Sequence, residues 1–243
     1  MSNLVATRTA TELVFVVHDT DAGLPAREFL AIIESINFAI EFSGHLAEVA
    51  APPAQPTRWE GDKQLADHVR IRRLRYGSPI EIVLDLQPLM NFLTNGGWLV
   101  FLGLVTKVFS QGATGWKTLE EAIELRRKSK SIRAKNKRLE DRRSPSATRD
   151  ARLSLAQAEA EQARAMSAFI TPLIEEAVAR VASQQDPLPV NSSPGAQFVR
   201  HRDRETLKER LAAEAASLIL RDRDTAEFAT AVLHGMAVDV AVE

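Results

Sequence analysis

The sequence predicts an α+β protein: a small three-stranded sheet (strand, helix, hairpin) with covering helices, then an all-α antiparallel helical arm and a terminal helical pair. Three observations predict this architecture. Three short segments before residue 90 concentrate or alternate apolar residues as strands do. A long apolar segment at helical spacing separates the first of them from the other two. From residue 118 onward, the pattern is helical and strongly charged.

The first strand and the first helix follow from residue type. Residues 12–18 (ELVFVVH) form a β-branched and aromatic run, which ends at the turn-like segment 19–23. Pro25 suits the first turn of the helix that follows. Apolar residues recur at helical spacing from Phe29 to Ala47 on more than one side, so we expect this helix to pack against two neighbours.

The clearest hairpin joins residues 69–76 to residues 80–86 through the turn 77–79. In its second strand, alternate residues form one apolar face: Ile80, Ile82, Leu84 and Leu86. In its first strand, the apolar residues change faces after Ile71. A β-bulge near Arg72-Arg73 would reconcile the two faces, and we predict one there.

Two longer helices are predicted in the arm. The seam of the first consists of Ala122, Leu125, Ser129, Ile132, Asn136 and Leu139. The seam of the second consists of Leu153, Ala156, Ala160, Ala163, Ser167, Ile170, Ile174, Ala177 and Val181. Pro172 must kink or restart the second helix, with Thr171 placed to cap a restart. Because both seams are thin, we expect an antiparallel hairpin that also packs against a second copy or a partner.

Composition divides the chain into four parts. We expect a small α+β domain over 1–112, the helical hairpin arm over 113–183, a linker over 184–197 and a C-terminal helical pair over 198–243. The linker is predicted from its Pro, Ser and Gln content. The terminal helices are predicted at Arg204–Leu220 and Asp224–Val238.

The absence of cysteine excludes disulfides, thiol catalysis and cysteine-metal sites. The first twelve residues have no apolar stretch of the signal-peptide type. Both observations lead us to expect a cytoplasmic protein, either free or peripheral to the membrane. The formal net charge is −1, so any attraction to a polyanion must come from local charge.

An apolar block leads into the arm. Its members are Trp98, Leu99, Val100, Phe101, Leu102, Leu104 and Val105. A membrane-spanning helix needs about 20 mostly apolar residues, whereas this block is short and is flanked by Asn95 and Lys107. We expect it to close the core of the sheet domain. Contact of residues 89–109 with a membrane surface is the alternative.

A basic segment follows the block. Residues 117–152 contain thirteen basic and six acidic side chains, a surplus of seven. Such a segment can be a solvated arm, or it can bind phosphates of nucleic acid, anionic lipid headgroups or an acidic partner. No aromatic residue interleaves the bases, so stacking on single strands is not supported. The candidate binding residues are Arg126, Arg127, Lys128, Lys130, Arg133, Lys135, Lys137 and Arg138.

Signals of catalysis are sparse. There is no P-loop, no G-x-G-x-x-G and no G-x-S-x-G. His18, Asp19 and Asp21 are weak catalytic candidates where the first strand meets a turn, although the aspartates suit a capped turn equally well. We expect no cofactor, no metal and no small-molecule ligand.

The leading hypothesis is a non-enzymatic interaction or assembly protein that uses its charged helical arm for self-association or partner binding. Two alternatives remain. One is a nucleic-acid-binding or regulatory protein that uses residues 126–152. The other is a membrane-surface-associated effector that uses residues 89–109.

Overall fold

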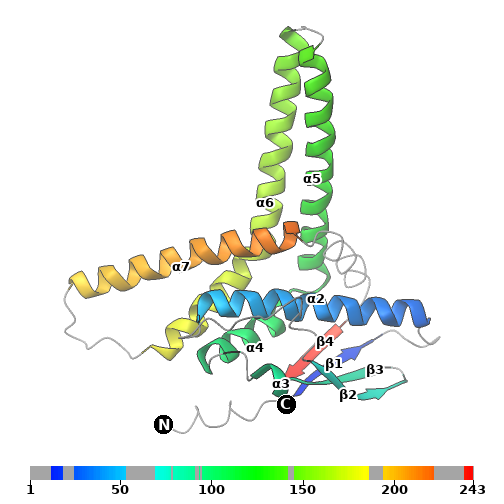
Figure 1. Cartoon of the computed structure of the whole chain (residues 1–243), viewed down its shortest axis with the longest axis vertical. Coiled ribbons are helices and arrows are strands. Elements are labelled where there is room, and N and C mark those ends of the chain that lie inside the picture. Colours follow the sequence, from blue (N-terminus) through cyan, green and yellow to red (C-terminus); the bar gives the residue numbers. More distant parts are fainter. Residues whose placement is uncertain are drawn as a thin grey trace.

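The structure is a computed structural model, and it describes residues 12–18, 25–52, 69–77, 79–90, 93, 95–141, 145–185, 194–221 and 238–242. Their arrangement is α+β, as the sequence predicts: an antiparallel sheet lies beside a helical layer, from which a helical hairpin projects (Figure 1). The predicted helix Asp224–Val238 falls outside the described residues, apart from its last residue.

The sheet has four strands in the order β2-β3-β1-β4. The three predicted strands are confirmed as β1 (Glu12–Val17), β2 (Arg70–Arg75) and β3 (Ile80–Asp85). The predicted bulge is also confirmed, because the pairing of β2 with β3 shifts between Ile71 and Arg73. This shift places Leu74 opposite Ile82 and lets both halves of β2 direct an apolar residue to the same face.

The fourth strand, β4 (Val238–Val242), was not predicted. It pairs antiparallel with β1, from Leu13 opposite Val242 to Val17 opposite Val238. The prediction of a helix ending at Val238 is therefore wrong at that residue. The run VDVAV alternates β-branched residues with others, and pairing satisfies backbone groups of β1 that would otherwise form an open edge.

Helix α4 (Asn95–Ser110) contains the apolar block and is deeply buried. Phe101 is 0% exposed and Trp98 is 4% exposed. Phe109, near its C-terminal end, contacts Phe15 of β1 edge to face, with the ring centroids 5.0 Å apart. The expectation that this block closes the core is confirmed, and Leu99 is the only one of its seven members that is not fully buried.

Helix α2 (Ala26–Ala50) packs against α4 and α7 (Pro194–Arg221). By length and composition, α2 is the one described helix that could cross a membrane, but 61% of its most apolar window is buried inside the protein. A core helix of this kind passes the same test. The two-sided apolar pattern of α2 accordingly corresponds to packing on two sides.

The arm consists of α5 (Gly112–Asp141) and α6 (Pro145–Gln184), which run antiparallel (Figure 1). Helix α6 is continuous through Pro172 and changes direction between the projecting arm and its C-terminal half, so the predicted kink is seen and the predicted restart is not. Helix α7 begins at Pro194, inside the predicted linker and ten residues before the predicted start at Arg204. A proline suits a helix start, and this signal was overlooked.

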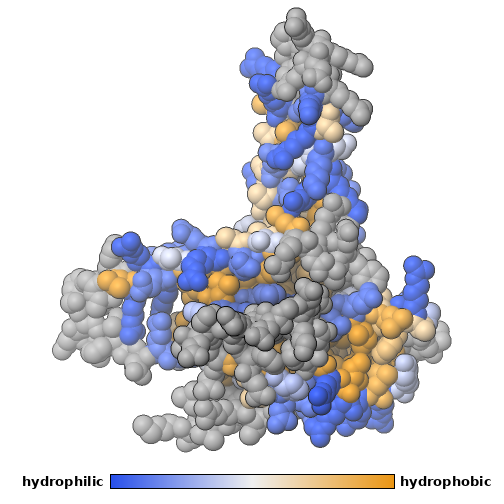
Figure 2. All heavy atoms as spheres, viewed as in Figure 1, coloured by the Kyte–Doolittle hydropathy of each residue, from blue (hydrophilic) through white to orange (hydrophobic). Residues whose placement is uncertain are grey.

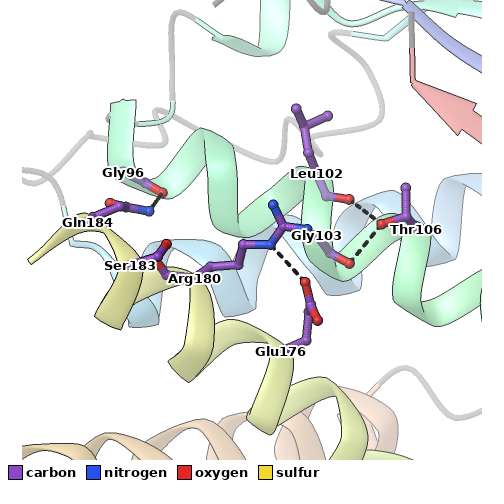
Figure 3. Close-up of polar contacts among 8 residues, drawn as sticks. All are labelled: Gly96, Leu102, Gly103, Thr106, Glu176, Arg180, Ser183 and Gln184. Carbon is purple, nitrogen blue, oxygen red and sulfur yellow. Dashed lines mark hydrogen bonds and ion pairs between the residues drawn. The ribbon is translucent and has the colours of Figure 1, made fainter. Parts of the chain in front are cut away.

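The short helix α3 (Gln87–Met90) precedes α4 in sequence. The C-terminal part of α6, here called its base, packs closely on α4. Gln184 Nε2 donates a hydrogen bond to the Gly96 carbonyl oxygen at 3.1 Å, and Arg180 pairs with Glu176 across Gly103 (Figure 3). A Cβ atom at Gly103 would lie 2.9 Å from Nε of Arg180 and 3.0 Å from Oε1 of Glu176. Glycine at this position therefore permits the close approach of the two helices.

We expect Gly103→Leu to lower the free energy of unfolding by about 1–3 kcal/mol, because the larger side chain must displace the Glu176–Arg180 pair and push α6 from α4. Gly103→Ala is the matched control. Its methyl group meets side-chain atoms of Arg180 and Glu176, which can shift, and alanine gains up to about 1 kcal/mol of helix propensity. Urea denaturation measures both, and a Leu variant as stable as the parent would contradict close packing here.

Candidate interaction surface on the helical arm

The two helices of the arm pair through the predicted seam of α5. Ala122, Ser129 and Asn136 are buried at 0%, 4% and 7% exposure, and Leu125 and Ile132 are half-buried. Ser129 Oγ donates to the Leu125 carbonyl oxygen at 2.9 Å, so this polar residue is satisfied within its own helix. This burial confirms the seam of α5 from Ala122 to Asn136, whereas the side chain of its last member, Leu139, lies outside the described residues.

The predicted seam of α6 is wrong in the projecting half of the helix. Leu153, Ala156, Ala160, Ala163 and Ser167 are all exposed there. The side facing α5 instead contains Leu155, Ala158, Met166 and Phe169. Both lines have helical spacing and small or apolar members, and spacing alone does not decide which line meets α5.

The exposed line on α6 forms a continuous strip, here called the α6 stripe: Leu153, Ala156, Ala160, Ala163 and Ser167. Leu153 is 57% exposed and is one of the five large hydrophobic residues that are exposed among those the structure describes. In the lower half of α6 the same line continues through Ile170, Ile174 and Ala177, which are buried at 4%, 8% and 1% exposure. The same line of residues is thus buried from Ile170 onward and exposed from Leu153 to Ser167.

The candidate basic residues lie on α5, and Arg133 and Lys128 are among the described ones that form ion pairs. Arg133 Nη2 lies 2.6 Å from Oε1 of Glu159 on α6, and Lys128 pairs with Glu124 at 3.0 Å. Arg126 is half-buried, and its Nη1 has no hydrogen-bond partner among the described residues. Arg127 is exposed and the side chain of Arg138 lies outside the described residues.

Three candidate lysines form no ion pair or side-chain hydrogen bond within the described part of the chain: Lys130, Lys135 and Lys137. Lys130 and Lys137 stand one turn either side of Arg133, with Arg126 a turn further, so these four share a face of α5, here called the basic row. Ala156 and Ala163 stand one turn either side of Glu159. The Arg133–Glu159 pair therefore lies between the basic row and the α6 stripe.

Of the three weak catalytic candidates, the structure describes only His18. His18 follows β1 directly and is half-buried, whereas Asp19 and Asp21 lie outside the described residues. Within the described segments, no three His, Asp or Glu side chains are placed to hold a metal ion. The placement of His18 thus adds no support to acid–base chemistry at this position.

A second exposed surface was missed from the sequence. Tyr76 and Leu30 are 66% and 60% exposed, and the Tyr76 ring lies 5.7 Å from that of Phe29. Figure 2 shows hydrophobic residues gathered where α2 begins beside the sheet, and mostly hydrophilic residues along the arm. The sequence does contain a sign that β2, which leads to Tyr76, is an exposed strand: four of its six residues are arginines. Arg72 pairs with Glu12 and Arg73 pairs with Glu81.

No family model, no curated protein and no solved structure matches this chain. The surfaces of the chain itself therefore carry the information about its function. The arm offers two of them, one of small and apolar residues and one of positive charge, with the Arg133–Glu159 ion pair between them.

We expect the Arg133–Glu159 pair to contribute about 0.2–1 kcal/mol, because both side chains are substantially exposed. A double-mutant cycle with Arg133→Glu, Glu159→Arg and the swapped double variant measures the charge coupling between the two positions, including the like-charge repulsion in each single variant. The swap should recover stability that each single reversal loses, and added salt should reduce the recovery. Thermal unfolding measures all four proteins; equal losses in the swap and the summed singles would show that the pair contributes nothing.

Proposed function

We propose that the protein is a non-enzymatic assembly protein, in which the α6 stripe of one copy packs against the α6 stripe of another. The observation that carries the proposal is the change in burial along α6. The line of residues that packs into the protein's own core below Ser167 continues above it with no cover among the described residues.

Side-chain size supports a helix as the partner. Ala156, Ala160 and Ala163 permit two helix backbones to approach closely, and Leu153 at the end of the stripe supplies a larger apolar contact. Spacing by alternating three and four residues is what a helix–helix seam requires. An extended peptide or a flat sheet would not follow this spacing.

Charge supports a second copy as the partner. Residues 149–164 of α6 carry three basic and three acidic side chains, so two copies of this segment meet without net repulsion. Residues 126–137 of α5 carry seven basic side chains and no acidic one, so two copies of that surface repel. A two-fold pairing through α6 therefore suits the charge pattern.

We expect light scattering to show a dimer at micromolar concentration and a monomer for the double variant Ala160→Glu, Ala163→Glu, because two buried, unpaired carboxylates oppose the contact. Ser131→Glu is the matched control. It lies two residues beyond buried Ser129, on the side of α5 that faces away from α6, and should leave the dimer intact.

A parent protein that stays monomeric throughout this range would overturn the proposal. Circular dichroism of the double variant distinguishes loss of pairing from loss of fold, because exposed Ala→Glu changes preserve helix propensity.

A second candidate function is binding of duplex nucleic acid by the basic row. The observation that favours it is the density of positive charge on α5, with Lys130, Lys135 and Lys137 unpaired within the described residues. Successive members of the row stand three or four residues apart, about 4.5–6 Å along the helix axis. Phosphates of a nucleic-acid backbone can be neutralised by side chains spaced in this way.

For this candidate we expect binding to duplex of random sequence that weakens steeply with salt. The affinity should fall about tenfold between 50 and 200 mM salt for every two phosphates that the protein neutralises. Charge reversal at Arg126, Arg127, Lys130 and Arg133 should abolish it, whereas reversal at Arg202 and Arg210 of α7 should not. Fluorescence anisotropy measures both. Binding to anionic vesicles without binding to duplex would assign the basic row to anionic lipid headgroups instead.

A further inference from the structure

We propose that a pocket between α6 and α7 binds a small amphipathic monoanion, namely a carboxylate on an apolar chain. The pocket has a volume of about 370 Å³, within the size range of small-ligand sites. It lies away from both arm surfaces, between the C-terminal half of α6 and the N-terminal half of α7, which run past one another in Figure 1. Binding at this pocket does not require the assembly proposed above.

One side of the pocket is apolar. Val178 and Val181 line it from α6, and Leu207 lines it from α7. Val178 is 8% exposed, while Val181 and Leu207 are half-buried and pack against the core. Burial of an apolar chain against these three side chains removes apolar surface of both partners from water, which is favourable.

The lining also includes two arginines, which share a face of α7 with Leu207. Arg200 and Arg204 stand one helical turn apart on α7, and neither forms an ion pair or side-chain hydrogen bond with another described residue. Like charges at this spacing repel each other. A carboxylate between them relieves that repulsion and accepts charge-assisted hydrogen bonds from the guanidinium groups.

Asp203 selects the charge of the ligand. It lines the same pocket between the two arginines in sequence, so the three side chains together carry one net positive charge. A monoanion neutralises this charge, whereas a dianion such as a phosphate monoester places a second negative charge near Asp203. The apolar wall requires the anion to have a hydrocarbon chain rather than to be a free inorganic ion.

Isothermal titration of the full chain with decanoate, decanol, decyl phosphate and decyltrimethylammonium tests this proposal. We expect decanoate to bind most tightly and the cationic amphiphile not to bind. The double variant Arg200→Gln, Arg204→Gln should weaken decanoate by about tenfold or more. Arg210→Gln, an exposed position on α7 that does not line the pocket, is the matched control and should change nothing.

A second variant examines the apolar wall. Val181→Trp fills the pocket and should abolish binding of decanoate while circular dichroism shows an unchanged helix content. Absence of decanoate binding to the parent, equal affinity for decanol, or full affinity in the double arginine variant would each overturn the proposal. Tighter binding of decyl phosphate would overturn the assignment of a monoanion.

Discussion

The burial of α4 is the constraint on which the rest of the structure depends. This helix packs on the sheet through Phe109 and Phe15, and it contacts α2 on one side and the base of α6 on another. A helix that is apolar all round is stable in water only when neighbours enclose it. Because α6 is one of these neighbours, the arm is fixed to the core by the same packing that makes the sheet domain stable.

This attachment divides α6 into a part that packs in the core and a part that projects in the arm. Below Ser167 its apolar line is part of the continuous core that also includes Leu211 and Ala215 of α7. Before Ser167, only the side of α6 that faces α5 is covered, and the same line of residues is exposed to solvent as the α6 stripe. A helix that passes from a core into a two-helix arm loses neighbours at that point, and the α6 stripe is where the lost neighbours would have been.

The parts of the fold that local pattern determines could be predicted from the sequence. The hairpin and its bulge follow from the alternation of neighbouring residues, and the burial of Trp98 and Phe101 follows from an apolar block too short for a membrane. The pairing of β4 with β1 could not be predicted in this way, because more than 200 residues separate the partners. The face of α6 that meets α5 and the pocket at Arg200 likewise depend on which helices become neighbours, which spacing does not encode.

The charge pattern of the arm indicates that its two surfaces act separately. The α6 stripe is flanked by balanced charge and gains its contact energy from apolar burial, which salt changes little. The basic row gains its energy from Coulomb attraction and counterion release, which salt reduces strongly. Arg133 and Glu159 lie at the border, and their mutual pairing lowers the positive charge nearest the stripe. A dimer formed through α6 would thus bring two basic rows into one assembly without placing either at the contact, and would raise the affinity for an extended polyanion by avidity.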